Sequence, residues 1–133
     1  MRTILLVAVA VALVGCEKPA PLGPQPTQRL GETLNATQIR QEIVGNTGTG
    51  TRTGTNSVYS MYVAPDGTLV EKLPTRTERG RWRITDDGHF CMHWPVDMGG
   101  REVCQTVHKA GVTVQLASPE SLEELVFQAG DKL

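Results

Sequence analysis

The feature that most constrains the fold is a series of turn sequences that recur at short intervals after residue 56. Pro65-Asp66-Gly67, Asp86-Asp87-Gly88 and Ala110-Gly111 all contain residues that favour tight turns. The segments between them are short, with alternating apolar, aromatic and β-branched residues, which is typical of strands. We expect strands at 57–63, 68–72, 79–85, 89–94, 101–107 and 112–117. This order predicts a mainly β fold, a small antiparallel meander that forms a curved sheet or a partly closed barrel.

One short helix is expected before the strands. Asn35 is suited to the N-cap, Gln38 occupies the third helical position of a capping box, and Gly45 can end the helix. Ile39 and Ile43 are four residues apart and therefore share one helical face. We expect that face to pack on the sheet.

Two segments carry conflicting signals. Residues 46–56 consist almost entirely of Thr, Gly and Asn, so we expect a strand that opens into a mobile loop. The segment has neither a P-loop nor a spaced-glycine dinucleotide motif. Near the C-terminus, Ser118-Pro119-Glu120 is typical of a helix start, whereas residues 124–128 fit a closing strand. We expect a short helical turn followed by that strand.

The N-terminus has the features of an export signal. A basic start, Met1-Arg2-Thr3, precedes an uninterrupted run of apolar or small residues at 4–14. This run is shorter than the roughly 20 residues of a permanent membrane-spanning helix, so residues 1–15 are typical of a signal peptide. At its end, Leu13-Val14-Gly15-Cys16 resembles the lipobox of bacterial lipoproteins. The resemblance implies cleavage before Cys16 and a diacylglycerol on its sulfur.

The lipobox also implies where the mature protein is located. Two or three acyl chains on Cys16 hold a protein at a membrane, because each buried methylene contributes about 0.8 kcal/mol. Glu17, rather than Asp, follows the cysteine, which by resemblance favours the outer over the inner membrane. Residues 16–31 are rich in proline and predict an extended tether. Residues 32–133 are then one small β domain that faces the periplasm.

The two remaining cysteines, Cys91 and Cys104, predict a disulfide. Export places them in a compartment that permits disulfides. The strands at 89–94 and 101–107 flank turn-rich residues 95–100 and are expected to form a hairpin. In this hairpin Cys91 lies opposite Cys104, close enough for a bridge. Free thiols or a metal pair are the alternatives, but the chain has neither CxxC spacing nor a second pair.

Turn, aromatic and cysteine motifs follow one another in a fixed order along the domain. They are Gly45-Asn46-Thr47, Tyr59, Tyr62, Pro65-Asp66-Gly67-Thr68, Gly80, Trp82, Asp86-Asp87-Gly88, Cys91, Trp94 and Cys104. In this order the chain resembles an uncharacterised family of small exported proteobacterial proteins, over residues 32–130. Because that family has no assigned activity, the resemblance implies an architecture and no catalytic residue. The lipobox and the Gly/Thr-rich segment depart from it.

The three histidines are the candidates for a metal site. Strand alternation turns His89 and His93 away from the core, with His108 diagonal to His89 on the same surface. His89 and His108, with Glu102 or Asp87 nearby, offer suitable ligand types. However, the register pairs His93 with Glu102 in an ordinary surface contact, and solvated strand histidines are the more common case. We therefore expect no metal, and no cofactor beyond the covalent lipid.

No residue pattern indicates catalysis or nucleic-acid binding. Loss of Arg2 with the signal lowers the basic count from 13 to 12 against 14 acidic residues, a formal charge of −2. The chain has no basic cluster for a phosphate backbone and no Gly-x-Ser-x-Gly motif. Trp82 and Trp94 are assigned to the core rather than to a ligand groove.

These features predict a lipid-tethered binding or interaction domain of the cell envelope, with an envelope protein as partner and no enzymatic activity. Thr47, Arg52 and Asn56 are the candidate contact residues, in a loop at 46–56; the loop at 95–100 is a second candidate edge. An inhibitor of an envelope hydrolase belongs to this class. The first alternative is a small-molecule binder that resembles a lipocalin, which requires a barrel with a lined cavity. An enzyme would need a cluster that only folding assembles.

Overall fold

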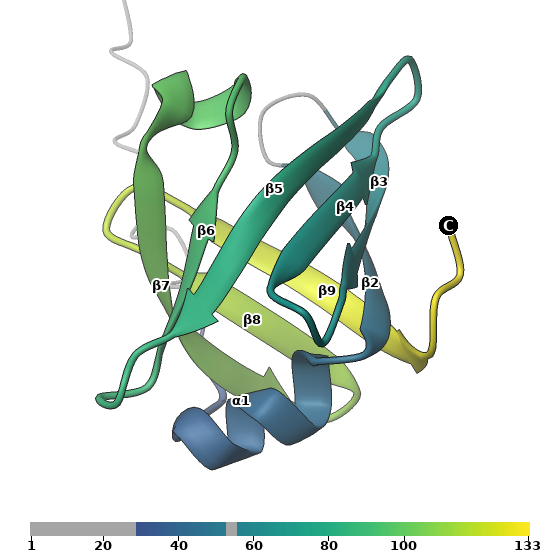
Figure 1. The fold of residues 1–133 in the computed structure, drawn as a ribbon. Helices are drawn as coiled ribbons and strands as arrows, with labels where there is room; N and C mark the ends of the chain where they lie inside the picture. Colours follow the sequence, from purple (N-terminus) through teal and green to yellow (C-terminus); the bar gives the residue numbers. More distant parts are fainter. Residues whose placement is uncertain (1–28, 53–55) are drawn as a thin grey trace, which may run out of the picture.

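A computed structural model describes residues 29–52 and 56–133, which form a closed antiparallel β-barrel with one helix (Figure 1). The strands are β1 (Glu32–Thr33), β2 (Asn46–Arg52), β3 (Ser57–Val63), β4 (Thr68–Lys72), β5 (Thr77–Ile84), β6 (His89–His93), β7 (Glu102–Ala110), β8 (Thr113–Ala117) and β9 (Leu122–Ala129). From β2 to β9, consecutive strands pair in chain order, and β9 pairs back to β2. The short β1 pairs with β7. The expected mainly β fold is confirmed, and its sheet closes fully.

The segment at 46–52 is a complete strand rather than the start of a loop. β2 pairs with β3 on one side and with β9 on the other. A Cβ added to Gly48 would lie 2.7 Å from the Phe127 ring, and one added to Gly50 would lie 2.5 Å from the Glu124 carbonyl oxygen. Glycine at these positions therefore lets β9 approach closely. The expected mobile loop falls partly on residues 53–55, which lie outside the described residues.

The helical turn expected at 118–120 is wrong. Ala117 pairs with Leu122 across β8 and β9, which leaves only four residues for the connection. Ser118 and Ser121 close this turn, since the Ser118 N–H donates to the Ser121 carbonyl at 2.8 Å. The Ser121 N–H also donates to the Ser118 hydroxyl at 3.1 Å. The closing strand itself is confirmed and is longer than expected, because it covers all of β9.

The helix α1 (Ala36–Ile43) covers one end of the barrel (Figure 1). Ile39 and Ile43 are fully buried there, as their spacing predicts. The Asn35 side chain accepts a hydrogen bond from the Gln38 N–H at 3.0 Å, and the Gln38 side chain accepts one from the Asn35 N–H at 2.9 Å. The capping box is thus confirmed. Within the described ranges, no helix has the length and apolar character needed to cross a membrane.

Asn35→Ala is expected to lower the free energy of unfolding by about 1 kcal/mol, because the first turn of α1 loses its side-chain acceptor. Urea unfolding followed by circular dichroism measures the difference. Asn35→Asp is the matched control, since aspartate caps as well as asparagine and should retain the wild-type value within error. An equal loss in both variants would contradict the capping role.

The interior of the barrel is filled by side chains that pack on one another. Trp94 is 2% exposed, and the Trp82 indole lies 6.1 Å from the Phe90 ring while its N–H donates to the Ala64 carbonyl at 2.8 Å. Trp94 therefore belongs to the core, as predicted, and Trp82 packs against the core as a partly buried side chain. The buried cluster comprises Leu34, Ile39, Ile43, Tyr59, Met61, Val63, Leu69, Phe90, Met92, Trp94, Val107, Val114, Leu116 and Leu125.

Candidate functional site

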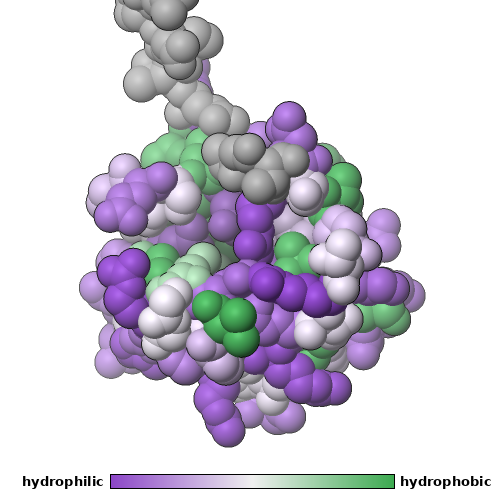
Figure 2. Space-filling model, turned by 90° about the horizontal axis from the view of Figure 1, so that it is seen from above, coloured by the Kyte–Doolittle hydropathy of each residue, from purple (hydrophilic) through white to green (hydrophobic). Residues whose placement is uncertain are grey.

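The end of the barrel opposite α1 carries a cluster of charged side chains. Strand ends and the short, kinked 3₁₀ segment η1 (Asp97–Gly100) meet at this end, the upper one in Figure 1. We call the cluster the charged rim; its members are Arg52, Tyr59, Glu71, Arg76, Glu78, Asp97 and Glu123. Figure 2 looks down on this end, where hydrophilic residues cover most of the face around a few hydrophobic ones. Residues distant in sequence thus meet in one charged cluster, in which Tyr59, Glu71 and Glu78 are buried.

Arg52 is the centre of the charged rim. Its Nη2 lies 2.6 Å from Oε1 of Glu71, and its Nη1 lies 3.0 Å from Oδ2 of Asp97. The guanidinium carbon lies 5.6 Å from the centroid of the Tyr59 ring, within the range of a cation–π contact. The last residue of β2 therefore joins β3, β4 and η1 through one cation.

Glu78 fixes the connection between β6 and β7. Its Oε1 accepts hydrogen bonds from the backbone N–H groups of Val96 at 3.0 Å and Asp97 at 3.2 Å. Arg76 bonds to Asp97 and lies 3.6 Å from Oε2 of Glu78. The segment at 95–100 is thus held against the barrel at Asp97, while Val96 remains 70% exposed.

Burial and charge shift the pKa values of the charged rim in different directions. Burial raises the pKa of the Glu71 carboxyl, and the neighbouring Arg52 offsets this only in part. Burial acts in the same direction on Asp97, but hydrogen bonds from Arg76 and Arg52 outweigh it and lower the pKa of that carboxyl. The Tyr59 hydroxyl donates to Oε2 of Glu123 at 2.7 Å, and burial together with this negative charge raises its pKa.

The structure separates the three residues predicted as contact residues at 46–56. Thr47 is 2% exposed, because its hydroxyl donates to the Gly130 carbonyl at 2.8 Å and accepts the Lys132 N–H at 3.0 Å. Arg52 is turned toward buried carboxylates. Asn56 is exposed and has a positive φ of 51°. The prediction of one exposed edge that includes Thr47 is therefore wrong, since the C-terminal residues cover that position.

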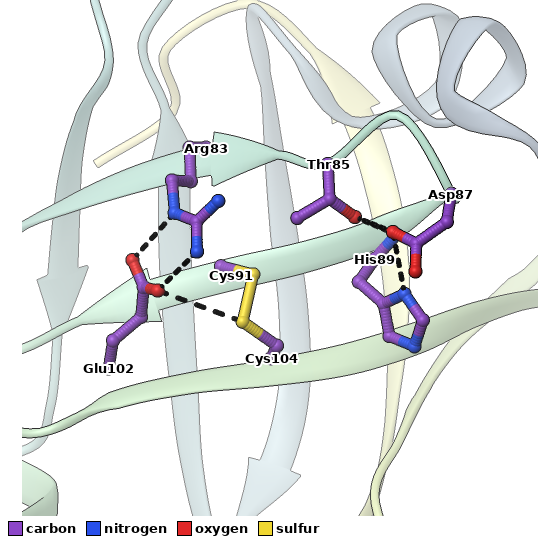
Figure 3. Close-up of a disulfide and its surroundings, with 7 residues drawn as sticks. All are labelled: Arg83, Thr85, Asp87, His89, Cys91, Glu102 and Cys104. Atoms are coloured by element: carbon purple, nitrogen blue, oxygen red, sulfur yellow. Dashed lines mark hydrogen bonds and ion pairs between the residues drawn. A yellow bond between two sulfur atoms is a disulfide. The ribbon is translucent and has the colours of Figure 1, made fainter.

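The predicted disulfide between Cys91 and Cys104 is confirmed (Figure 3). The two residues lie directly opposite each other in the β6–β7 register, with Cα atoms 3.9 Å apart. Cys91 is fully buried, although alternation places it on the outer face of the barrel. Figure 3 shows the ion pair of Arg83 and Glu102 beside the bridge, with Oε1 of Glu102 3.8 Å from Sγ of Cys104.

The structure does not assemble the histidines into a metal site. The register confirms the pairing of His93 with Glu102. His89 Nδ1 lies 3.2 Å from Asp87 (Figure 3). His108 is 6% exposed, because β1 covers it, and its two ring nitrogens bond to the hydroxyls of Thr33 at 3.1 Å and Thr106 at 2.9 Å. Within the described ranges, neither His89 nor His108 belongs to a group of three ligand atoms close enough to share a metal ion.

Sequence reasoning missed the carboxylates of the charged rim. Glu71 shares the inward face of β4 with Leu69, as the alternating burial of that strand shows. The charge of Glu71 on this apolar strand face was the signal available in the sequence, because a buried charge requires a partner. The partner could not be named from the sequence, since Arg52 was assigned to a loop.

The charges of the rim determine what it can bind. When all groups are ionised, four carboxylates and two guanidiniums leave an excess of two negative charges. Such a surface favours cations and basic groups on a partner. Comparison of the chain with protein-family models, curated proteins and solved structures gives no match.

Proposed function

We propose that this chain is a lipid-tethered binding domain of the cell envelope, anchored through Cys16 and contacting an envelope protein with the charged rim. The observation that carries the proposal is the charged rim itself, a set of ion pairs held in place at one end of a closed barrel. Preorganised charges recognise a partner without the entropy loss of ordering flexible side chains. The lipobox supports the anchor and the periplasmic address, with the outer membrane favoured.

The surface around the charged rim is suited to a basic partner. Its excess negative charge favours lysine and arginine side chains, and Val96 offers an exposed apolar group beside Asp97. A partner that covers this end would bury an apolar centre inside a charged border. The proposal includes no catalytic role, no nucleic acid and no cofactor beyond the lipid.

The small-molecule alternative receives partial support. Closure of the barrel is the architecture that a lipocalin-like binder needs. The inward side chains, however, pack in a single buried cluster, whereas a ligand inside the barrel would need apolar side chains that face a cavity. We therefore favour a protein partner over a ligand inside the barrel.

Crosslinking in intact cells, followed by mass spectrometry of captured proteins, tests the proposal. We expect the wild-type chain to capture one envelope protein, and Cys16→Ser to lose it because the domain is no longer held at the membrane. Fractionation of the same cells checks the anchor separately.

A matched pair of surface variants identifies the contacting end. Val96→Lys places a charge beside the charged rim, whereas Val112→Lys changes another exposed valine, at the β7–β8 turn at the opposite end. Capture should fall in Val96→Lys and persist in Val112→Lys. Equal capture by both variants would rule out the charged rim, and no specific capture by a folded, anchored chain would rule out a protein partner.

A further inference from the structure

Three carboxylates of the charged rim converge on one point. Glu71 from β4, Glu78 from β5 and Asp97 from η1 each offer one oxygen, and these three oxygens lie within 4.8 Å of one another. Glu71 is 2% exposed and Glu78 is 8% exposed. Two carboxylates buried this deeply carry a large desolvation cost, so their oxygens require compensating partners.

The protein satisfies only one oxygen of each buried glutamate. Oε1 of Glu71 is held by Arg52 at 2.6 Å, and Oε1 of Glu78 accepts the two backbone N–H groups of η1 and its preceding residue. Oε2 of Glu71 and Oε2 of Glu78 are buried and accept no hydrogen bond among the described residues, although Oε2 of Glu78 lies 3.6 Å from Nη2 of Arg76. Each glutamate is thus fixed in orientation through one oxygen. Oε2 of Glu71 is left for a ligand, and Oε2 of Glu78 has only its ion pair with Arg76.

The surrounding charges favour a divalent cation. Arg52 and Arg76 leave the charged rim with an excess of two negative charges, counting Glu123, when its groups are ionised. A divalent ion would cancel this excess. The hydrogen bonds on the Oε1 atoms are the kind of outer contacts that orient carboxylate ligands around a metal.

The ligand atoms select the type of cation. An all-oxygen set suits hard ions such as Ca²⁺, Mg²⁺ and Mn²⁺ rather than Zn²⁺ or Cu²⁺. Ca²⁺ binds oxygen at roughly 2.3–2.6 Å, so two ligands on opposite sides of it are separated by about 5 Å. Mg²⁺, at about 2.0–2.1 Å, limits that separation to about 4 Å. The three oxygens lie within 4.8 Å of one another, and the flexible coordination of Ca²⁺ accommodates such a set more readily than the near-ideal octahedron that Mg²⁺ demands.

We propose that Glu71, Glu78 and Asp97 form a Ca²⁺ site at the end of the barrel opposite α1, with water completing the coordination. The other group of three potential ligands in the described part, Cys91, Glu102 and Cys104, is different, because the disulfide occupies both sulfurs. The Ca²⁺ site does not depend on the lipid anchor, and an ion bound there would compete with the basic groups of the proposed partner for the same negative charge.

Calorimetric titration of the purified full chain tests this site. The protein is first stripped with EDTA and then titrated with CaCl₂ and, separately, with MgCl₂. We expect saturable binding of one Ca²⁺, a higher melting temperature in Ca²⁺ than in EDTA, and weaker binding of Mg²⁺. Absence of saturable Ca²⁺ binding at millimolar concentration overturns the proposal, and tighter binding of Mg²⁺ overturns the assignment to Ca²⁺.

Near-isosteric variants locate the ion. Glu71→Gln and Glu78→Gln should each weaken Ca²⁺ binding at least tenfold, because each removes a charged ligand. Glu32→Gln, on the exposed β1, is the matched control and should bind like the wild type. Circular dichroism checks that each variant is folded. If Glu71→Gln or Glu78→Gln does not fold, Asp97→Asn takes its place. Equal affinity in the rim variants and in Glu32→Gln would show that Ca²⁺ binds elsewhere and overturn the site.

Discussion

Replacement of Cys91 and Cys104 together by alanine is expected to lower the free energy of unfolding by about 3 kcal/mol. The bridge closes a short loop, with a sequence separation of 13, and so restricts the unfolded chain. It also ties β6 to β7 on the wall of the barrel, where the two strands already pair in register. The loss is large for a domain of this size, whose total stability is on the order of 5–15 kcal/mol.

Urea unfolding of the oxidised wild type and of the double variant measures this difference. The wild type in the presence of a reductant is the control, and its midpoint should move toward that of the double variant. If the oxidised wild type and the double variant unfold at the same urea concentration, the bridge contributes no net stability.

The elements that were predicted correctly are those determined by residues close to one another in the sequence. The hairpin that carries the disulfide depends on a turn-rich segment between two alternating strands, so its register could be derived from the sequence around residues 95–100. The capping box of α1 lies within four consecutive positions, Asn35 to Gln38. Such short-range patterns determine local structure because all interacting groups are close in the chain.

Closure of the barrel could not be derived in the same way. It depends on the pairing of β2 with β9, two strands that lie at opposite ends of the domain sequence. β2 hides its strand character, because Gly48 and Gly50 supply no inward side chain and so remove the apolar alternation. The bulk that fills the space comes from Phe127 and Leu125 of β9. The strand character of β2 can be recognised only when β2 and β9 are considered together.

The charged rim was missed for the same reason. Arg52 is separated from Glu71 by 19 residues and from Asp97 by 45 residues. Once 46–56 had been interpreted as a loop, its arginine was expected at the surface. Arg52 points inward because it lies in β2, and β2 could be recognised as a strand only once the barrel was known to close.

Arg52→Met is expected to lower the free energy of unfolding by about 3 kcal/mol at pH 7, at the lower end of the cost of breaking a buried ion pair. The variant leaves Glu71, with a side chain only 3% exposed, without its cation, and removes one of the two arginines on Asp97. The cost is moderated because the Arg52 side chain is itself 32% exposed. Arg83→Met is the matched control: its pair with Glu102 is largely exposed, so the stability should change little.

The deficit of Arg52→Met should also depend on pH. Burial raises the pKa of Glu71 in the folded state, and loss of Arg52 raises it further. The stabilising contribution of this carboxyl to the free energy of unfolding is therefore present at low pH and is lost as pH rises through the folded pKa. The pKa of Asp97 is lowered in part by Arg52, and that stabilisation, present above the unfolded pKa, is also reduced in the variant. Both effects make the deficit small near pH 4 and larger near pH 7. Urea unfolding of both chains at the two pH values, with EDTA present, measures it, and an equal deficit at both would contradict the pairing of Arg52 with ionised carboxylates.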